Sequence, residues 1–540
     1  MGCRVLPDFL VWLLEPPAGK VLGPLWTTSE RKKAPGPMPR RHTFSSFRAF
    51  SIDPGSEEPL HRQLYNELRT AILGGRLPTG CRLPASRELA QVTRLSRNTV
   101  LSAYDQLIAE GYIDSRAGSG TYVASTLPDQ VLTGPEIEPL PAIERTARRL
   151  TREGERLRAM PFRRWPPQPS GPMFFRAGLP ALDQFPMDTW RRLTDKRLRL
   201  ASVKTLAYDE PQGYRPLREA IAGHLAAARG ARCSPDQILV CSGSQQAIAL
   251  AQRVLVEEGD EVLFEDPGYF AARAVFEAAG ARVVPVPVDE EGFDVSAAVA
   301  AAPHAKLAYV TPSHQNPLCV TMSLQRRRAL LHWAETHGGW ILEDDNASEC
   351  RYRGRPLAAL QGIDPHGRVL YAGTFSKVMF SALRLGYLVA PPDLVSTIVR
   401  ERELMDRQSP GVNQAVMADF MTEGHFARHL RRMRTVYANR LAALTNAVRE
   451  HAPDLFEIAE LEGGLNRVAW LPPGLSDSEA VAALQPEGFA CLPVSEFRLR
   501  PGGRGGLVMG FAGMTEDVIE SCVRRMATIL RPMVRSEARA

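Results

Sequence analysis

The sequence predicts a multidomain protein in which a small α+β block precedes a larger α/β domain built on a mostly parallel central sheet. Three observations lead to this prediction. The chain has 540 residues, which exceeds what a single hydrophobic core usually serves. Residues 51–125 repeat apolar positions at helical spacing, whereas residues 171–540 alternate apolar strands with amphipathic helices, as parallel α/β domains do. The final stretch of roughly 100 residues is expected to form a smaller α+β lobe.

The composition narrows the class of protein. An apolar fraction of 44% with 23% charged residues is ordinary for a globular chain, and the net charge of +6 permits nucleic-acid binding without requiring it. The eight cysteines are scattered without a close pair, which favours a reducing compartment and argues against a disulfide framework or a zinc site. No stretch approaches the ~20 apolar residues of a membrane helix. We therefore expect neither a membrane span nor a bound metal.

Two segments lack the periodicity of a folded domain. Residues 1–50 are rich in proline and arginine and are predicted to be a disordered extension. Their apolar run, Val5–Leu14, is interrupted by a proline and an aspartate and makes a poor signal peptide, so Met38 is an alternative start of the chain. Residues 126–170 are rich in proline, arginine and glutamate and are predicted to be a linker, with a short helix from Ala142 to Arg158.

Three helices and a two-stranded wing are predicted within the first block. The first helix has apolar residues at four-residue spacing on one face: Leu60, Leu64, Leu68 and Ile72. Pro84-Ala85-Ser86 opens a second helix, and Ser96 is a good N-cap for a third. The buried side of the third helix is predicted to carry Val100, Ala103, Tyr104, Leu107 and Ile108. Two short strands follow, Tyr112–Ser115 and Thr121–Val123, joined by a tight loop that contains glycine.

The start of the third helix carries residues that suit contact with DNA. Arg97, Asn98 and Thr99 occupy its first turn, which meets base edges and phosphates in helix-turn-helix proteins. Arginine can read guanine, asparagine can read adenine, and a helix N-terminus favours phosphate. The glycines of the wing loop carry no side chain and so allow close approach to a minor groove. The alternative is a three-helix interaction module that makes no DNA contact.

The larger domain is predicted to contain strands in alternation with helices, including six candidate strands. Their ranges are Gln237–Val240, Glu261–Phe264, Arg282–Val286, Leu307–Val310, Trp340–Glu343 and Val369–Ala372. The carboxyl ends of parallel strands meet at one edge of a sheet, so the residues after these strands are expected to form a common site.

Lys377 is the most informative residue at that edge. The chain has only seven lysines among its 66 lysines and arginines, and this one closes an apolar strand that ends in a small turn bearing hydroxyl groups. Lysine can lose its proton and attack an aldehyde to form a Schiff base, whereas a guanidinium stays protonated. A lysine at this position, in a chain that otherwise uses arginine, therefore indicates a reaction that needs an amine. The alternative is a surface lysine after a strand.

The neighbouring strand ends supply the other parts of a pyridoxal 5′-phosphate pocket. Such a pocket needs an acid at the ring nitrogen, donors for the phosphate and the ring hydroxyl, and a flat residue on the ring. Asp344 closes an apolar strand and suits the ring nitrogen, while Ser244 and Gln245 open a helix whose N-terminus favours phosphate. The remaining candidates are Thr374, Ser376 and Arg384 for the phosphate, Asn316 for the ring hydroxyl and Tyr269 for stacking. Taken singly, each is also typical of an ordinary cap or turn.

Both halves of the chain resemble known families. Residues 59–124 resemble the GntR-type winged helix on three motifs, Leu83–Ala90, Ser96–Val100 and Gly118–Val123. That resemblance implies DNA contacts from Arg87, Ser96, Arg97, Asn98, Thr99 and Gly118. From about Phe174 to Leu530 the chain resembles class I aminotransferases of fold type I, in which the lysine matched by Lys377 carries the cofactor as a Schiff base.

The combination resembles the MocR-type subgroup of GntR-family regulators across residues 59–530. The resemblance implies a cytoplasmic transcriptional regulator, associated with the nucleoid when it is bound to an operator. It also implies pyridoxal phosphate binding, a response to that cofactor or to a small amine, and a head-to-tail homodimer. Two alternatives are a true aminotransferase with an appended DNA module, and a degenerate scaffold that binds no cofactor and regulates through oligomerisation alone.

Three positions depart from the family pattern. Asn346 stands where the subgroup typically has a tyrosine, and Leu318-Cys319 where it has Thr-Gly. Val508 stands where catalytic aminotransferases carry the arginine that forks onto the substrate carboxylate. A bidentate arginine–carboxylate pair is a strong, oriented contact that valine cannot replace, so efficient transamination of ordinary α-amino acids is not expected. Cofactor binding strictly requires none of the three positions and remains expected.

Overall fold

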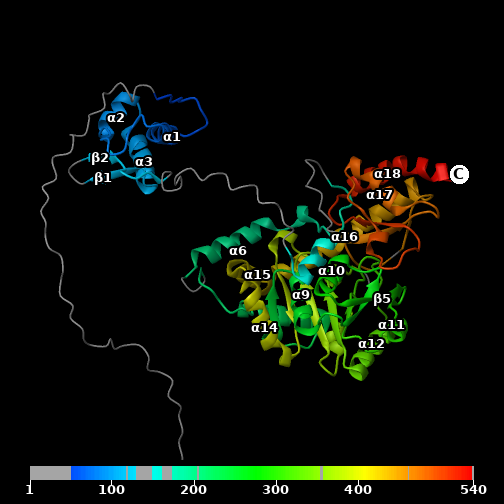
Figure 1. Cartoon of the computed structure of the whole chain (residues 1–540). Coiled ribbons are helices and arrows are strands. Elements are labelled where there is room, and N and C mark those ends of the chain that lie inside the picture. Colours follow the sequence, from blue (N-terminus) through cyan, green and yellow to red (C-terminus); the bar gives the residue numbers. More distant parts are fainter. Residues whose placement is uncertain are drawn as a thin grey trace, which may run out of the picture. The chain divides into compact units, whose positions relative to one another are not determined.

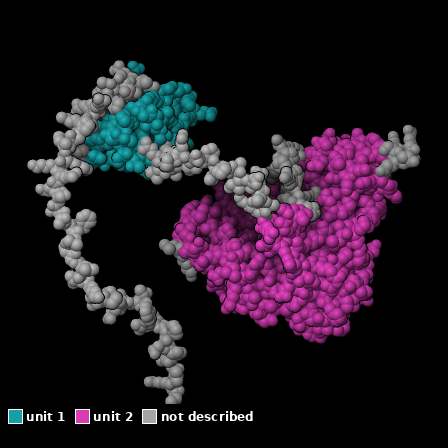
Figure 2. All heavy atoms as spheres, viewed as in Figure 1, with its two compact units in different colours: residues 1–148 teal, residues 149–540 magenta. Residues whose placement is uncertain are grey.

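The computed structural model describes residues 50–116, 120–128, 149–160, 173–202, 206–352, 357–459 and 461–537. The chain divides into two compact units, residues 1–148 and residues 149–540 (Figure 2). The predicted extension lies outside the described residues except for Phe50, and so does most of the predicted linker. Among the helices that the described ranges contain, none combines the length and apolar character needed to cross a membrane.

Within its described residues, the first unit has three helices followed by an antiparallel pair of strands (Figure 1). The elements are α1 (Leu60–Leu73), α2 (Ser86–Thr93), α3 (Arg97–Ala109), β1 (Ile113–Arg116) and β2 (Gly120–Val123). Their common core contains Leu64, Leu68, Leu89, Val100 and Leu107, all fully buried. Because α1 and α3 place these residues at helical spacing, one face of each helix faces the core, as expected. The prediction for Ile108 was wrong, since its side chain lies at the edge of that face and is 39% exposed.

The second unit is built on an eight-stranded sheet in the order β3-β10-β9-β8-β7-β4-β5-β6. The strands are β3 (Ile238–Cys241), β4 (Glu261–Asp266), β5 (Arg282–Asp289), β6 (Gly292–Phe293), β7 (Leu307–Val310), β8 (Trp340–Asp345), β9 (Val369–Thr374) and β10 (Gly386–Val389). The inner strands β5, β4, β7, β8 and β9 pair in parallel, whereas β10 runs antiparallel to both β3 and β9. The predicted mostly parallel α/β sheet is thereby confirmed.

Helices cover both faces of this sheet, which explains the apolar runs inside its strands, such as Val262–Phe264 of β4 and Trp340–Leu342 of β8. On one face, α9 (Ser244–Leu255), α10 (Phe270–Ala279) and α14 (Pro392–Asp406) share a core with Phe264 of β4. On the other face, α11 (Val295–Ala301) and α12 (Leu324–His337) pack on Leu263, the preceding residue of the same strand. The remaining helices of the larger part are α6 (Met187–Arg199), α8 (Arg215–Arg229), α13 (Leu360–Ile363) and α15 (Gly411–Thr422).

A smaller α+β lobe follows, as predicted for the end of the chain. Its four-stranded antiparallel sheet has the order β11-β12-β14-β13. The strands are β11 (Glu457–Ile458), β12 (Asn466–Trp470), β13 (Leu492–Pro493) and β14 (Gly506–Gly510), and the helices are α16 (His425–His451), α17 (Asp477–Leu484) and α18 (Glu516–Glu537). Helices α16 and α18 pack along each other beside this sheet (Figure 1).

One short helix from the predicted linker belongs to the second unit. Helix α5 (Arg152–Ala159) is capped by Thr151, whose hydroxyl accepts a hydrogen bond from the Gly154 amide at 3.0 Å. It covers the second half of the helix predicted from Ala142 to Arg158. Residues 142–148 lie outside the described residues.

Candidate functional site

The carboxyl ends of the parallel strands meet around one cavity of about 380 Å³. Asp344 is the last residue but one of β8, and Lys377 follows β9, the parallel neighbour of β8. The small lobe closes the cavity from the other side, through β12, β13 and β14. The predicted cofactor residues that line this cavity are Ser244, Gln245, Tyr269, Asn316, Asp344, Lys377 and Arg384. Residues from five separate segments are thus brought together as the strand-end argument expected.

The amine of Lys377 is held inside the protein with few polar contacts. Its Nζ donates a hydrogen bond to the carbonyl of Gly178 at 3.2 Å. Burial lowers the pKa of Lys377, and the nearby Asp344 carboxylate only partly opposes that shift. A larger share of neutral amine is therefore present at neutral pH, which is the nucleophilic form. Gly178 itself has φ +73°, which favours glycine, and a Cβ there would displace the Lys377 amine from its present position.

Asp344 has one oxygen engaged and one free. Its Oδ2 accepts a hydrogen bond from the Tyr309 hydroxyl at 2.7 Å, while its Oδ1 is buried without a hydrogen-bond partner among the described residues. Burial raises the pKa of Asp344 to about 6, and the neighbouring Asp345 adds to the increase. A buried carboxylate with an unused oxygen suits a cationic partner such as a protonated pyridine nitrogen.

The N-terminus of α9 and Arg384 form a second polar corner. Ser244 is the first residue of α9, and it follows Gly243, which has φ +125°. A Cβ on Gly243 would lie 3.5 Å from the Arg384 guanidinium, so this arginine lies directly beside the start of the helix. Backbone N–H groups at a helix N-terminus together with a guanidinium favour a phosphate group.

Three predicted phosphate contacts have other partners or positions. Thr374 and Ser376 do not line the cavity, and the Thr374 hydroxyl instead accepts a hydrogen bond from the Ser376 amide at 3.2 Å. Both residues therefore shape the turn that leads to Lys377. The Gln245 amide group donates to the Ala271 carbonyl at 2.8 Å, which ties α9 to α10.

Each of the three departures from the family pattern places a residue at this cavity. Asn346, Cys319 and Val508 each contribute to its lining. Cys319 has φ +65°, a left-handed conformation that favours glycine, which explains why glycine is typical there. Burial raises the pKa of the Cys319 thiol to about 11, so this cysteine stays protonated at neutral pH.

Sequence reasoning missed several residues of the site. Tyr309 lies inside β7, where no motif marks it, and reaches Asp344 from the neighbouring strand. Asn466, at the start of β12, accepts a hydrogen bond from the Gly178 amide at 2.7 Å. It thereby joins the small lobe to the residue whose carbonyl contacts the Lys377 amine. His314 is also part of the lining, and burial lowers its pKa to about 3, so its imidazole is neutral.

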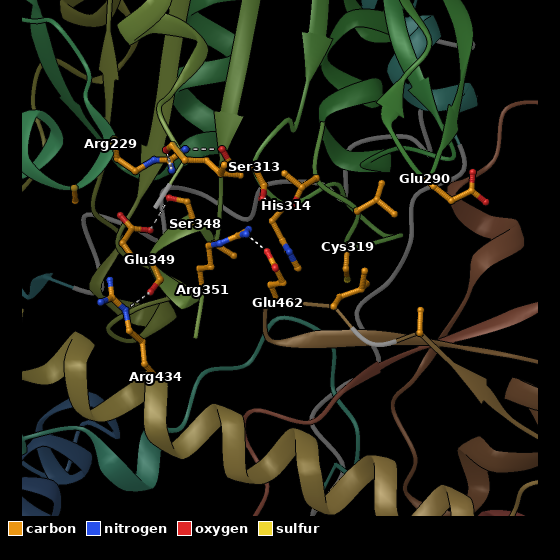
Figure 3. Close-up of a pocket in the computed structure, with 18 of the residues that line it drawn as sticks. Arg229, Glu290, Ser313, His314, Cys319, Ser348, Glu349, Arg351, Arg434 and Glu462 are labelled. Atoms are coloured by element: carbon orange, nitrogen blue, oxygen red, sulfur yellow. Dashed lines mark hydrogen bonds and ion pairs between the residues drawn. The ribbon is translucent and has the colours of Figure 1, made fainter. Parts of the chain in front are cut away.

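His314 and Cys319 also line a second cavity of about 500 Å³ (Figure 3). The charged side chains of this second cavity are largely paired with each other or with buried neighbours. Arg229 lies 2.9 Å from the Asp345 carboxylate, and Arg351 forms an ion pair with Glu462. The first cavity is the one that combines a reactive amine with unused polar groups.

The predicted DNA contacts lie together on the first unit. Ser96 caps α3 by accepting a hydrogen bond from the Thr99 amide at 3.0 Å, which leaves Arg97 and Asn98 exposed in the first turn. Arg97 Nε lies 3.4 Å from the Ser86 hydroxyl at the start of α2, next to the exposed Arg87. The starts of α2 and α3 thereby lie close together, with Arg87 and Arg97 exposed on them. Gly118 lies outside the described residues.

Comparison with known proteins matches both halves of the chain. The family described as "Aminotransferase class I and II" matches residues 173–526, and "Bacterial regulatory proteins, gntR family" matches residues 60–123. The "Probable rhizopine catabolism regulatory protein MocR" of Rhizobium meliloti is 39% identical over 86% of this chain and 92% of its own length. The "HTH-type pyridoxine biosynthesis transcriptional regulator PdxR" of Corynebacterium glutamicum is 30% identical over 87% of this chain and 95% of its own.

Solved structures resemble the second unit. The kynurenine aminotransferase of Pyrococcus horikoshii, in complex with PMP, is 27% identical and covers 74% of this chain and 98% of its own, with a TM-score of 0.63. LysN, an α-aminoadipate aminotransferase from Thermus thermophilus complexed with N-(5′-phosphopyridoxyl)-L-leucine, is 30% identical with the same TM-score. It covers 68% of this chain and 94% of its own.

Proposed function

The chain belongs to the MocR-type subgroup of GntR-family regulators, and on that premise we propose that it is a transcriptional regulator that senses pyridoxal phosphate or a small amine. In this proposal residues 51–125 bind operator DNA, residues 126–170 form the linker, and residues 171–540 hold the cofactor. The observation that carries the proposal is the single cavity shared by Lys377, Asp344 and the start of α9 in a chain that also has a GntR-type domain.

The residues of the cavity fit pyridoxal phosphate. The unused Asp344 Oδ1 and the glycines at positions 178 and 243 leave a polar, accessible space beside the lysine amine. When bound, the cofactor supplies an aldehyde and an electron-withdrawing ring. Lys377 provides the neutral amine for that aldehyde, and Asp344 holds a proton on the ring nitrogen. The other assigned roles are Ser244, Gln245 and Arg384 at the phosphate, Asn316 at the ring hydroxyl and Tyr269 on the ring face, while Thr374 and Ser376, expected at the phosphate from the sequence, shape the turn before Lys377.

Helix α10 links this cavity to the linker helix α5. Tyr269 and Phe270, at the start of α10, line the cavity. At the other end of α10, Arg156 of α5 donates a hydrogen bond to the Ala278 carbonyl at 3.0 Å and forms an ion pair with Glu258 at 2.8 Å. An arginine is favourable there because the carbonyl end of a helix carries partial negative charge. A ligand that moves Tyr269, at the start of α10, would therefore alter the contact between Arg156 of α5 and the other end of α10.

This contact is suited to a reversible switch. Helix α5 has no buried side chain, and Leu157 is 54% exposed, so apolar packing does not fix the helix in place. The attachment depends mainly on the polar contacts of Arg156, and partly exposed ion pairs contribute little free energy, commonly below about 1 kcal/mol. Modest changes at α10 can release it. We propose that this step passes the state of the cavity to the linker and hence to DNA binding.

The remaining parts of the proposal concern partners and location. The chain acts as a head-to-tail homodimer on a double-stranded operator, in the cytoplasm and at the nucleoid. Val508 favours regulation over transamination, because the substrate-carboxylate arginine is replaced by an apolar residue. Multiple turnover with an amino donor and a keto acid would instead favour the aminotransferase alternative.

A spectroscopic titration tests cofactor binding. Adding pyridoxal phosphate to the purified full-length protein is expected to give a saturable visible absorbance band that remains after desalting. Lys377→Ala should abolish the band, while Lys306→Ala, a change at an exposed lysine, should leave it intact. A band that survives unchanged in Lys377→Ala, or no band in the unaltered protein, would refute the assignment.

A further inference from the structure

One wall of the Lys377 cavity is made by the sheet of the small lobe. Side chains alternate along a strand, so Val468 of β12 faces the side opposite to its neighbour Arg467. Val508 of β14 lies directly across from Val468, and Leu492 of β13 lies directly across from Val508. The position that carries a carboxylate-binding arginine in catalytic relatives is therefore the middle of an apolar stripe.

Further apolar side chains extend this stripe along the cavity. Phe270, Phe497 and Ala177 belong to the same cluster as Val508 and Leu492, and all five line the cavity. We call these five residues the apolar wall. The rings of Phe270 and Phe497 meet edge to face with their centroids 5.5 Å apart. The wall is thus a continuous packed surface rather than a single valine substitution.

The cationic groups that line the cavity already have a role in the proposed cofactor site. Among the lining residues that the structure describes, only Lys377 and Arg384 are cationic, because burial keeps His314 neutral. Lys377 is the amine proposed for the cofactor aldehyde, and Arg384 lies beside the start of α9 at the proposed phosphate corner.

Arg467 and Arg176 lie near the cavity without lining it. Arg467 is buried on the other face of β12, where it donates to the Gly463 carbonyl at 2.8 Å and to the Tyr352 hydroxyl at 2.6 Å. Arg176 precedes Ala177 and acts on Lys377 through charge, but its side chain is not part of the lining. Neither provides a guanidinium on the apolar wall.

We propose that the effector taken by this cavity is a primary amine with an uncharged, apolar side chain and no carboxylate. Its amine lies toward Lys377 and its side chain rests on the apolar wall. An α-amino acid placed the same way would bury its carboxylate against Val508 and Leu492 without a counter-ion, which is unfavourable. This inference rests on the proposed function, because it takes the cofactor cavity as the place where the effector binds.

Matched pairs of ligands test the inference on the unaltered full-length protein. 2-Phenylethylamine and L-phenylalanine differ only by the carboxylate, and so do 3-methylbutylamine and L-leucine. Each is titrated into protein loaded with pyridoxal phosphate, and dissociation constants are taken from visible absorbance and tryptophan fluorescence. Each amine is expected to bind at least about tenfold more tightly than its amino acid. Equal or tighter binding of the amino acids, or no binding of either amine, would overturn the proposal.

A variant pair assigns the selectivity to the wall. Val508→Arg supplies the missing guanidinium and should shift the ratio toward the amino acids by about tenfold or more, whereas Val508→Leu should keep the original ratio. Because Val508 is only 1% exposed, thermal unfolding must show that Val508→Arg is folded, and the ligand pairs on the unaltered protein decide the question if it is not. Failure of pyridoxal phosphate itself to bind would refute the proposed function, whereas cofactor binding without amine selectivity would refute only this inference.

Discussion

Tyr309 donates its hydroxyl hydrogen to Asp344 Oδ2 at 2.7 Å and leaves Asp344 Oδ1 without a hydrogen-bond partner among the described residues. The tyrosine fixes the orientation of the carboxylate, and the free oxygen remains available inside the cavity. A buried carboxylate held in this way stabilises a bound cation. When it is ionised without a cationic partner, it destabilises the folded protein. Asp344 therefore links the stability of the empty protein to its affinity for the cofactor.

Asp344→Asn is expected to lower cofactor affinity and raise the stability of the cofactor-free protein. The amide cannot hold a proton on the ring nitrogen, so the dissociation constant of pyridoxal phosphate should rise by about 10- to 100-fold, as measured by absorbance titration. The change also removes a buried negative charge. Asp195→Asn, at an exposed aspartate of α6, is the matched control and should alter neither quantity. Unchanged cofactor affinity in Asp344→Asn would contradict the role given to this carboxylate.

The stability gain of Asp344→Asn should depend on pH. Burial raises the pKa of Asp344 from its ordinary 3.8 to about 6, so between these values the folded protein binds more protons at this site than the unfolded chain. The contribution of Asp344 to the unfolding free energy therefore becomes less favourable as pH rises through this window. Chemical denaturation should show almost no difference from the unaltered protein at pH 3.5 and a gain of roughly 1–3 kcal/mol at pH 8. A gain that is equal at both pH values would contradict the assigned shift.

Arg156→Gln is expected to uncouple cofactor binding from DNA binding. The change removes the contacts between α5 and the end of α10 while leaving the cavity intact. Cofactor affinity should stay within about twofold, whereas the ratio of operator affinities with and without cofactor should move toward one. Arg158→Gln is the control on the same helix, since Arg158 is 67% exposed and pairs only with Glu155 among the described residues. If cofactor binding changes operator affinity in Arg156→Gln as much as in the unaltered protein, α5 does not transmit the state of the cavity.

Arg97→Ala is expected to weaken operator binding. If Arg97 contacts a base, its loss should weaken binding by about 1–3 kcal/mol and relax specificity at one position. If it contacts a phosphate, its loss should reduce the slope of the salt dependence by about one unit. Fluorescence anisotropy over a series of salt concentrations distinguishes the two. Arg199→Ala, at an exposed arginine of the other unit, should change neither value. Affinity and salt dependence unchanged in Arg97→Ala would exclude the first turn of α3 from the DNA interface.

Substitutions of Cys319 are expected to separate backbone conformation from side-chain packing. Its φ of +65° is unfavourable for residues with a Cβ and more so for β-branched ones. Cys319→Gly relieves this strain but loses packing and gains unfolded-state entropy, so its stability should lie within about 1 kcal/mol of the unaltered protein. Cys319→Val should be destabilising by about 2 kcal/mol or more. Cys241→Val, in strand β3, is the control and should be tolerated; equal effects at both cysteines would contradict this explanation.

The sequence was sufficient to predict which residues at the strand ends would lie together. It was not sufficient to predict the direction in which individual side chains point. Lys377 and Asp344 close apolar strands, and parallel neighbours bring such ends together whatever the rest of the fold. Tyr309 could not be found this way, because it lies within a buried strand and reaches Asp344 across the sheet. Thr374 and Ser376 were expected at the phosphate, yet the direction of the turn places them outside the lining.

The same limit explains the other differences. Helical periodicity identified the cores of α1 and α3 but put Ile108 on the buried side, where a position at the margin of the apolar stripe can face solvent. The pairing of α5 with α10 depends on one arginine and the end of another helix, which no local pattern encodes. The apolar wall depends on the pairing of β13 with β14, which brings Leu492 beside Val508 and which no local sequence pattern encodes.

The most direct test of the account is the affinity of the full-length protein for an operator that it selects from random DNA, measured with and without pyridoxal phosphate. The account predicts that the two dissociation constants differ by about fivefold or more in the unaltered protein and are equal in Lys377→Ala. Identical dissociation constants in the unaltered protein would contradict the claim that this cavity controls DNA binding.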